Sequence, residues 1–325
     1  MNSSLLEIKD LHVWFEVFGG VLKVLDGVDL VVRTREKVGV AGETGCGKTI
    51  TMKAMMGILP MPPARIPKGE IIFQGKDILK MGSKEMQGIR GRGMSMIPQG
   101  ATASLNPVFT IGDQLISVIK HSGDSRDTMS KEKRRQKAVD ILTEVRIPDP
   151  ERIMKNYPIQ LSGGMRQRIL IAMTLATEAK LIIADEPSTA LDVTTQEQIL
   201  RLMRELVEKR SVSVILITHN LGVVRQLTER TYIMYAGAVV EAAKTRDLFS
   251  KAMHPYTRGL IASVPKLTGE GIAPGIRGMI PDYSEAPKGC RFHPRCDHAM
   301  PMCREKPPFF EVGEDHQVAC YLYRR

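Results

Sequence analysis

The sequence is poor in aromatic residues and in cysteine, and it lacks any long hydrophobic run. Phe, Trp and Tyr make up 5% of the 325 residues, with a single tryptophan. No apolar stretch approaches the roughly 18 to 20 residues that a transmembrane helix needs. The opening MNSSLLEIKD becomes acidic and polar too early for a secretory signal. We therefore expect a chain that works in the cytosol, where thiols stay reduced and structural disulfides are rare.

The charge of the chain is strongly positive, but no nucleic-acid motif accompanies it. The formal net charge is +10, from 46 Lys and Arg residues against 36 Asp and Glu. The densest basic run, KEKRRQK at 131–137, fits one solvated face of a helix, with contact to an anionic lipid surface as the alternative. Zinc-finger spacing and aromatic–glycine motifs are both absent from the sequence, so we expect no nucleic-acid partner.

The strongest motif is a glycine-rich loop between a predicted strand and a predicted helix, in VGVAGETGCGKTIT at 38–51. Glycines let successive backbone N–H groups point at phosphate oxygens, and the following helix directs its positive end to the same place. Lys48 adds a charge for the β- and γ-phosphates, and Thr49 offers a hydroxyl to Mg²⁺. We expect the side chain of Cys46 to point away from phosphate. The predicted nucleotide-binding residues of this loop are Gly42, Glu43, Thr44, Gly45, Cys46, Gly47, Lys48, Thr49 and Ile50.

Two adjacent carboxylates end a second predicted strand, in AKLIIADEPSTALD at 179–192. The apolar run 181–184 is typical of a buried parallel strand, and ligands gather at the carboxyl ends of such strands. Adjacent carboxylates are costly there unless a cation or a base shares the site. We therefore expect Asp185 to hold Mg²⁺ through water and Glu186 to polarise the water that attacks the γ-phosphate.

Two further predicted strands end in polar side chains that suit the same site. GMSMIPQ at 93–99 ends in Gln99, whose amide we expect to reach Mg²⁺ and the attacking water. VSVILITHN at 212–220 is followed at its end by His219, which we expect to sense the γ-phosphate.

A second anion-binding helix start is predicted within YPIQLSGGMRQRILIAMTLATEAK at 157–180. Ser162 is a capping residue, and Gly163 and Gly164 leave their N–H groups unshielded. One nucleotide cannot easily use both this helix start and the glycine-rich loop within a single fold. The simplest solution is that this segment completes the nucleotide site of another copy or of a paralogue.

In their order and spacing, GETGCGKT, Gln99, LSGGMRQR, LIIADEPSTALD and His219 resemble the ATP-binding subunits of ABC transporters. The resemblance covers about residues 5–250. It implies an α/β fold: a P-loop ABC-type nucleotide-binding domain at 1–250, with a RecA-like core, an antiparallel β-subdomain and a helical subdomain at about 100–175. It also implies ATP and Mg²⁺ as cofactors, and two such subunits that sandwich two ATP molecules head to tail.

The same resemblance implies roles for individual residues. Glu186 is expected to be the catalytic base, His219 the switch at the γ-phosphate, and Asp192 the link between the two ATP sites. Lys48 and Gln99 complete the predicted catalytic group.

Motif position makes Phe15 the residue expected to stack on adenine, with Trp14 as the alternative. Met165 and Ile50 depart from residues common in the family, but neither replaces a catalytic group. An active ATPase half-site is therefore predicted.

Two further stretches resemble the oligopeptide, dipeptide and nickel importers: ATASLNPVFTIGDQL at 101–115 and HPYTRGLIASVP at 254–265. They imply an ATPase that powers import of oligopeptides or dipeptides, with oligosaccharides or nickel as alternatives. The implied partners are a second ATPase subunit (commonly a paralogue), two transmembrane permease subunits and an extracytoplasmic solute-binding protein, at the cytoplasmic face of the cell membrane. A soluble ABC ATPase acting on ribosomes or DNA is the alternative from a different class.

A predicted C-terminal extension at 251–325 holds four of the five cysteines, Cys290, Cys296, Cys303 and Cys320. Their spacing lacks the close pairs of zinc ribbons. Four thiolates in a proline-rich loop suit a [4Fe–4S] cluster, and some importers of the resembled group hold such a cluster there. Zinc on the same four thiolates and simple packing without metal are the alternatives.

Overall fold

The polypeptide folds into two compact units, one of which is built from both ends of the sequence. The computed structural model describes residues 4–122, 129–189, 191–264 and 275–324. The discontinuous unit comprises Met1–Met81 and Leu216–Arg325, and the contiguous unit is Gly82–Ile215. Residues after 250 therefore belong to the same compact unit as the N-terminal strands.

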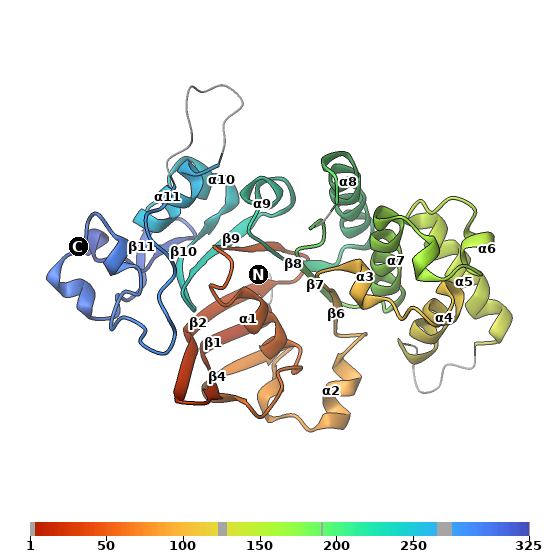
Figure 1. The fold of residues 1–325 in the computed structure, drawn as a ribbon, viewed down its shortest axis with the longest axis horizontal. Helices are drawn as coiled ribbons and strands as arrows, with labels where there is room; N and C mark the ends of the chain where they lie inside the picture. Colours follow the sequence, from red (N-terminus) through yellow and green to blue (C-terminus); the bar gives the residue numbers. More distant parts are fainter. Residues whose placement is uncertain (1–3, 123–128, 190, 265–274, 325) are drawn as a thin grey trace. The chain divides into compact units, whose positions relative to one another are not determined.

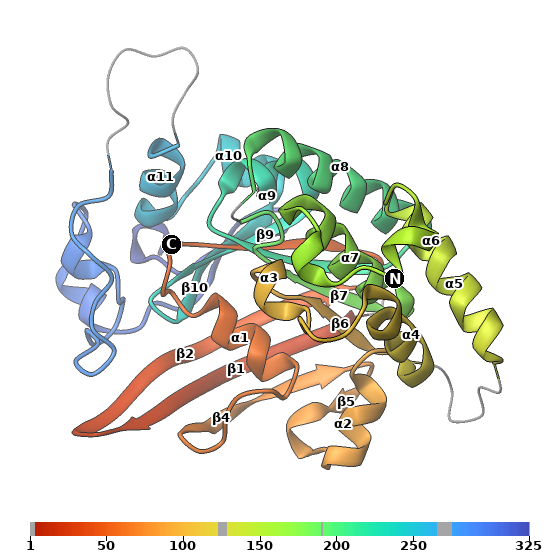
Figure 2. The same ribbon diagram turned by 45° about the vertical axis from the view of Figure 1, so that its right-hand side comes forward.

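The discontinuous unit contains an antiparallel sheet in the order β2-β1-β4-β5. Its two longest strands run side by side as a ribbon (Figure 2). In β1, Leu6 and Ile8 are buried, and after a bulge so are Leu11 and Val13. In a regular strand side chains alternate between the two faces, so the second pair would point to the face opposite to the first pair. The bulge at Asp10, with φ of 45°, shifts the register and returns the second pair to the same face. The strands are β1 (Ser4–Val17), β2 (Gly20–Arg33), β4 (Ala64–Phe73) and β5 (Lys76–Asp77).

The same unit contains five strands of a second sheet, in the order β11-β12-β10-β9-β3. β3 pairs with β9 in parallel, and the other pairs are antiparallel. Three helices gather beside β9 and β10 (Figure 1). The strands are β3 (Lys37–Ala41), β9 (Arg230–Tyr235), β10 (Ala238–Lys244), β11 (Phe310–Gly313) and β12 (His316–Val318). The helices are α1 (Lys48–Met55), α9 (Leu221–Leu227), α10 (Thr245–Ser250) and α11 (Pro255–Ala262), with 3₁₀ turns at Ile78–Lys80, His293–Arg295, Pro301–Arg304 and Tyr321–Tyr323.

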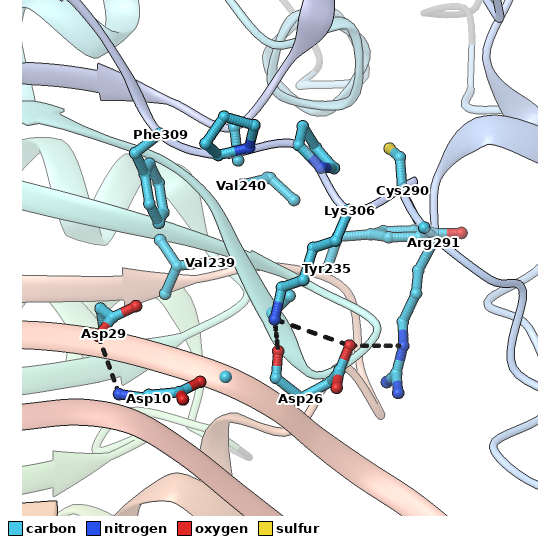
Figure 3. A pocket seen from close by; sticks show the side chains of 16 residues that line it. Asp10, Asp26, Asp29, Tyr235, Val239, Val240, Cys290, Arg291, Lys306 and Phe309 are labelled. Carbon is cyan, nitrogen blue, oxygen red and sulfur yellow. Dashed lines mark hydrogen bonds and ion pairs between the residues drawn. The ribbon is translucent and has the colours of Figure 1, made fainter. Parts of the chain in front are cut away.

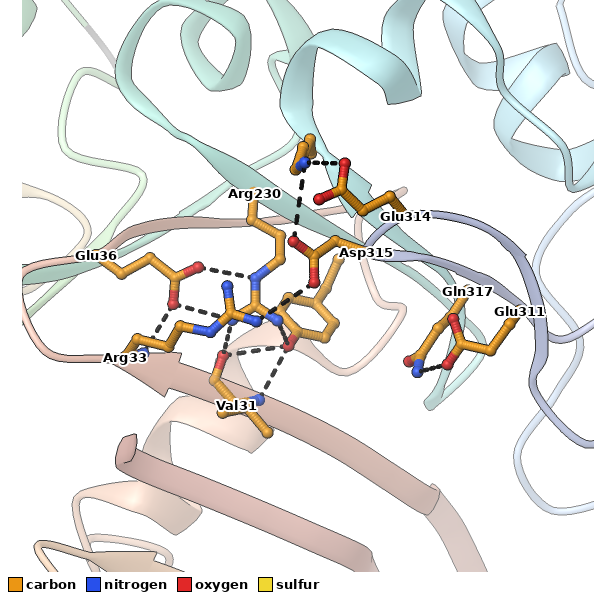
Figure 4. A network of polar contacts seen from close by, with 10 residues as sticks. Val31, Arg33, Glu36, Arg230, Glu311, Glu314, Asp315 and Gln317 are labelled. Carbon is orange, nitrogen blue, oxygen red and sulfur yellow. Dashed lines mark hydrogen bonds and ion pairs between the residues drawn. The ribbon is translucent and has the colours of Figure 1, made fainter. Parts of the chain in front are cut away.

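A buried ion pair joins the two sheets of this unit (Figure 4). Arg230, at the start of β9, donates to both carboxylate oxygens of Glu36 at 2.8 and 2.9 Å. The same guanidinium donates to the carbonyl of Val31 in β2 at 2.8 Å. Removing either partner would leave a buried charge without its counterion, so the pair fixes β2 against β9. An exposed pair between Arg33 and Asp315, at 3.4 Å, lies beside it and holds the β11–β12 turn.

The contiguous unit combines a helical region with two parallel strands. β6 pairs with β7, and every residue of β7 is buried, as predicted. The basic run 131–137 opens α5, with most of its side chains exposed. The elements are α2 (Ser83–Ile89), β6 (Met94–Ile97), α3 (Ala101–Ser104), α4 (Ile111–Ser122), α5 (Lys131–Glu144), α6 (Pro150–Ile153), a 3₁₀ turn (Pro158–Gln160), α7 (Gly163–Ala176), β7 (Leu181–Asp185) and α8 (Val193–Arg210). β8 (Ser213–Thr218) begins in this unit and ends in the other. Within the described residues, the helices are all too short or too polar to cross a lipid bilayer.

Candidate nucleotide-binding site

The glycine-rich loop leads from β3 into α1, as the sequence predicts. Gly42 has φ of 155°, and a Cβ at this position would lie 2.2 Å from the carbonyl oxygen of Met234. Gly47 has φ of 103°, and a Cβ there would lie 2.7 Å from a methyl group of Leu25. Both positions therefore require glycine for backbone conformation and for space. As the N-cap of α1, Gly47 offers no side-chain acceptor to the first helical N–H groups, which suits an anion as their partner.

Lys48 is buried, and its ammonium lies within the curl of this phosphate loop. Its Nζ donates to the carbonyl oxygens of Gly42 at 2.8 Å and Glu43 at 2.9 Å. Cys46 is completely buried, and burial raises the pKa of its thiol. Lys48 thus places a positive charge among the backbone groups of the loop, where an incoming phosphate would meet it.

Glu186 follows β7, and two neighbouring side chains orient its carboxylate. Oε2 accepts hydrogen bonds from Nε2 of Gln99 at 3.0 Å and from Oγ1 of Thr189 at 2.8 Å. The structure therefore brings together two residues that the sequence predicted separately. Glu186 has φ of 47°, a left-handed conformation that costs a non-glycine residue about 1 to 2 kcal/mol. Asp185, the last residue of β7, is 3% exposed.

The serine–glycine segment opens α7, as predicted. Ser162 is the N-cap, and its Oγ accepts from the N–H of Met165 at 3.3 Å. A Cβ on Gly164 would lie 2.7 Å from Cγ2 of Thr195, so glycine lets α7 pack closely on α8. Asp192 caps α8: its Oδ1 accepts from the N–H of Thr195 at 2.9 Å, and this bond lowers the pKa of the carboxyl.

The two aromatic residues proposed for adenine stacking differ in their surroundings. The ring of Trp14 already has Nζ of Lys23 at 5.1 Å and the guanidinium of Arg65 at 5.0 Å from its centroid. Phe15 is half-buried and points to the opposite face of β1, because successive side chains of a strand alternate. These contacts favour Phe15, whose role stays a prediction.

The predicted site residues fall into two sets. Phe15, the phosphate loop 42–50 and the exposed His219 at the end of β8 belong to the discontinuous unit. The contiguous unit holds the others, namely Gln99, Ser162, Gly163, Gly164, Asp185, Glu186 and Asp192.

Three C-terminal side chains that bind the phosphate loop were missed from the sequence. The hydroxyl of Tyr256 accepts from the N–H of Glu43 at 2.9 Å. Tyr283 donates to the carbonyl of Gly45 at 2.7 Å, and Arg295 pairs with the carboxylate of Glu43 at 3.1 Å. Tyr256 lies in HPYTRGLIASVP, which the sequence marked only as a resemblance to importers. No local signal marks the other two, because their partners lie 238 and 252 positions away.

The four C-terminal cysteines converge on one small pocket, which Phe292 and His254 also line. All four are free thiols, and the N–H of Cys290 donates to the carbonyl of Cys303 at 2.9 Å. Burial raises the pKa of the Cys290 thiol to about 11. Among the residues that the structure describes, however, no three His, Cys, Asp or Glu side chains are arranged to hold a metal ion. The predicted metal is thus not confirmed.

A larger pocket, of about 310 Å³, lies where the C-terminal segment meets β2 and β10 (Figure 3). Two cations at its edge fasten that segment to β2. Lys306 donates to the carbonyl of Asp26 at 2.6 Å, and Arg291 donates to the carbonyl of Lys23 at 3.0 Å. The Asp26 carboxylate lies 3.8 Å from Lys306 and 3.9 Å from Arg291. These contacts hold the segment that carries Tyr283 and Arg295 in place.

Comparison with known proteins identifies both parts of the sequence. Residues 25–189 match the ABC transporter family, and residues 240–303 match the C-terminal region of oligopeptide/dipeptide transporters. The dipeptide transport ATP-binding protein of Bacillus subtilis is 44% identical over 323 residues, covering 98% of this chain and 95% of that protein. An oligopeptide transport ATP-binding protein of the same bacterium is 44% identical over 324 residues, covering 98% of this chain and 89% of that protein.

Solved structures agree with this assignment. A dimeric ATP-binding cassette in a post-hydrolysis state, bound to ADP and phosphate, superposes with a TM-score of 0.65 at 27% identity, covering 74% of this chain and 99% of that chain. The fold is thus the P-loop ABC ATPase fold that the sequence predicted. With its phosphate loop, paired carboxylates and serine–glycine helix start, the chain is an ATP hydrolase and belongs to the ATP-binding proteins of ABC transporters that carry the oligopeptide/dipeptide C-terminal region.

Proposed function

We propose that this chain is an ATPase subunit that powers the import of oligopeptides or dipeptides. The observation that carries the proposal is similarity along nearly the whole chain to dipeptide and oligopeptide transport ATP-binding proteins, C-terminal region included. The subunit would sit at the cytoplasmic face of the membrane, bound to two permease subunits that an extracytoplasmic solute-binding protein loads. Oligosaccharide and nickel import are outcomes of the test below.

ATP would lie on the phosphate loop, with its adenine against Phe15. Mg²⁺ would be held by Thr49, Gln99 and Asp185, whose hydroxyl, amide and carboxylate oxygens are ligands that this ion accepts. Mg²⁺ supplies charge neutralisation at the phosphates when bound. Glu186 would take a proton from the attacking water, and its two hydrogen-bond donors, Gln99 and Thr189, support this role because they fix the carboxylate without adding a charge.

A second ATPase subunit, a copy or a paralogue, would complete the site. Ser162, Gly163 and Gly164 open a helix of fourteen residues, Gly163–Ala176, whose N-terminus can bind phosphate. The phosphate loop offers a second such helix start in the same chain. Two chains would use both helix starts if the phosphate loop of each faced the serine–glycine segment of the other. Asp192 would then lie near the shared boundary, and His219 at the γ-phosphate. The dimeric state of the similar solved cassette supports the arrangement.

Exposed apolar side chains before the serine–glycine segment suit contact with the permease subunits. Val108 is 71% exposed, Phe109 52% and Ile159 83%, all in the contiguous unit. The backbone links these segments, because the N–H of Ile111 donates to the carbonyl of Asn156 at 2.9 Å. Apolar side chains exposed together are typical of protein interaction sites.

We expect Phe109→Asp to prevent assembly with the permease pair while leaving ATP binding by the free subunit intact, because a buried charge opposes the apolar contact. The measurement is co-purification with the permeases, followed by ATPase assays in lipid nanodiscs with binding protein loaded with a dipeptide, an oligosaccharide or Ni²⁺. Phe18→Asp is the matched control, since Phe18 is fully exposed in the other unit. If only the binding protein loaded with oligosaccharide or Ni²⁺ stimulated ATP hydrolysis, that ligand would replace peptide as the proposed substrate. Recovery of the chain with ribosomes instead of permeases would reject the import function.

We further propose a [4Fe–4S] cluster on Cys290, Cys296, Cys303 and Cys320. Their convergence on one pocket supports it. Zinc on the same four thiolates is the alternative, and it would hold all four sulfurs at about 2.3 Å from one centre. In a cubane each thiolate would bind a different iron, which separates the sulfurs more widely. The cluster would cross-link a segment that has few large apolar side chains of its own.

Anaerobically purified protein is expected to contain about four irons and four sulfides per chain, with a broad absorbance shoulder. Cys303→Ser should lower the iron content and the thermal stability, whereas Cys46→Ser should leave the iron content unchanged. If the protein contained one zinc per chain and no iron, the same four cysteines would be zinc ligands and the cluster would be rejected. If metal-free protein were as thermally stable as the iron-containing preparation, the four cysteines would have only a packing role.

A further inference from the structure

We infer that Tyr283, Arg295 and Tyr256 are positioning residues for ATP: they preorganise the phosphate loop from the C-terminal part of the chain. This inference rests on the ATPase function and adds residues to it that lie outside the phosphate-loop motif. The three side chains come from separate places, two of them in the C-terminal segment and the third in α11. All three reach the loop between positions 43 and 45.

Glu43 is held by both its backbone and its side chain. Its N–H donates to the hydroxyl of Tyr256 at 2.9 Å, and its carbonyl accepts from Lys48 at 2.9 Å. Its carboxylate accepts from Nη1 of Arg295 at 3.1 and 3.3 Å. Because each polar group of Glu43 has a partner within the protein, this residue is held in one position in the loop.

The next fixed point is the peptide plane between Gly45 and Cys46. The Gly45 carbonyl accepts from Tyr283 at 2.7 Å, while the N–H of Cys46 donates to the carbonyl of Glu43 at 3.2 Å. The carbonyl of Cys46 accepts from the N–H of Gly237 at 2.9 Å. Since the peptide group is planar, these bonds set the direction in which the following N–H groups of the loop point. Burial raises the pKa of Tyr283, so its hydroxyl remains a donor at neutral pH.

The supporting side chains are themselves fixed. The guanidinium of Arg295 is 8% exposed and also donates to the backbone carbonyls of Arg277 at 2.7 Å and Gly278 at 3.2 Å. The rings of Tyr235 and Tyr256 lie 4.7 Å apart, and Phe292 packs against both at 5.1 and 5.4 Å. A rigid support of this kind lowers the entropy that the loop loses when phosphate binds.

We expect Tyr283→Phe and Arg295→Met each to raise the dissociation constant for ATP about three- to tenfold, the loss of one hydrogen bond. The full-length chain would be titrated with ATP under Mg²⁺, and KM and kcat measured in parallel. A positioning role raises KM and leaves kcat within about twofold at saturating ATP. Arg295→Lys should recover part of the affinity because it keeps the charge.

Two matched substitutions in the same part of the chain serve as controls. Tyr321→Phe removes a hydroxyl that donates to the carbonyl of Lys306 at 3.2 Å, and Arg258→Met removes a guanidinium that donates to the carbonyl of Ala252 at 2.9 Å. Neither side chain has one of these bonds to the loop, so ATP affinity should not change. In a double-mutant cycle, Glu43→Gln and Arg295→Met should be non-additive, because Arg295 acts through Glu43.

The inference would be overturned if the Tyr283→Phe and Arg295→Met proteins fold and bind ATP with wild-type affinity. It would also be overturned if both control variants lost as much ATP affinity as these two. A wild-type chain that fails to bind ATP would instead reject the ATPase function itself. These two failures are therefore distinguishable.

Discussion

Replacing Glu186 with glutamine is expected to lower ATP turnover by about 10² to 10⁴-fold, the range of a lost general base. The substitution keeps the shape of the side chain and an oxygen that can accept from Gln99 and Thr189. It removes the carboxylate that we propose as the acceptor of the proton from water. ATP binding, and the dimerisation proposed above, should survive, because the phosphate loop and Lys48 are unchanged. Phosphate release by the assembled transporter and equilibrium ATP binding by the subunit measure the two effects separately.

Glu197→Gln is the matched control for this substitution. Glu197 is an exposed carboxylate on α8 within the same unit, and its replacement should leave turnover unchanged. Turnover by Glu186→Gln within threefold of wild type would remove Glu186 from the role of base. Loss of ATP binding in that variant would point to a structural role for the left-handed turn at Glu186 instead.

Acidification from pH 7 to pH 5 is expected to lower the free energy of unfolding by about 2 kcal/mol through His254 alone. His254 is 1% exposed, and its Nδ1 accepts from the N–H of Tyr256 at 3.1 Å. Burial lowers the pKa of His254 to about 4 from a usual value near 6.5. Between these values the unfolded chain binds a proton that the folded chain does not, so stability falls as the pH falls.

The charged group nearest to His254 is the carboxylate of Glu241. Glu241 is completely buried and accepts from the N–H of His254 and from Nε2 of His316, each at 2.8 Å. Burial opposes ionisation of Glu241, but these hydrogen bonds bring its pKa below the usual value. Its stabilising effect is therefore lost only at more acidic pH. The ring of Phe292, 5.7 Å away, carries no charge.

His254→Asn tests this pH dependence, because asparagine can cap α11 through an oxygen but cannot take up the proton. Urea unfolding at pH 7 and pH 5 should show a loss about 2 kcal/mol smaller in this variant than in the wild type. His298→Asn changes an exposed histidine of the same unit and should keep the wild-type pH dependence. An unchanged pH dependence in His254→Asn would assign the acid sensitivity to other groups.

The parts of the fold that follow from local rules were predictable from the sequence. The strand, glycine loop and helix around Lys48 follow from a continuous pattern, and so does the serine cap at Ser162. The buried strand that ends in Asp185 is equally local, since four apolar residues precede the carboxylate. In each case the motif and its supporting elements lie within about twenty residues of each other.

The support of the loop by Tyr283 and Arg295 could not be predicted, because it depends on tertiary contacts between distant segments. One tyrosine hydroxyl and one guanidinium among 46 Lys and Arg residues carry no pattern of their own. The hydrogen bond of Gln99 to Glu186 is a similar case, joining residues 87 positions apart. The four C-terminal cysteines are a third case. Their clustering in the sequence suggested a shared site, but their spacing could not distinguish metal binding from packing.

The discontinuity of the first unit has a consequence for the order in which a ribosome produces its parts. The phosphate loop is synthesised early, whereas Arg295 follows 252 positions later, after the whole contiguous unit. At about 5 to 20 residues per second, the nascent loop waits roughly 10 to 50 s for its support. During that interval we expect a chain with a complete phosphate-binding motif to bind nucleotide less tightly than the finished protein. We expect the same of truncated products of interrupted translation that end before Arg295.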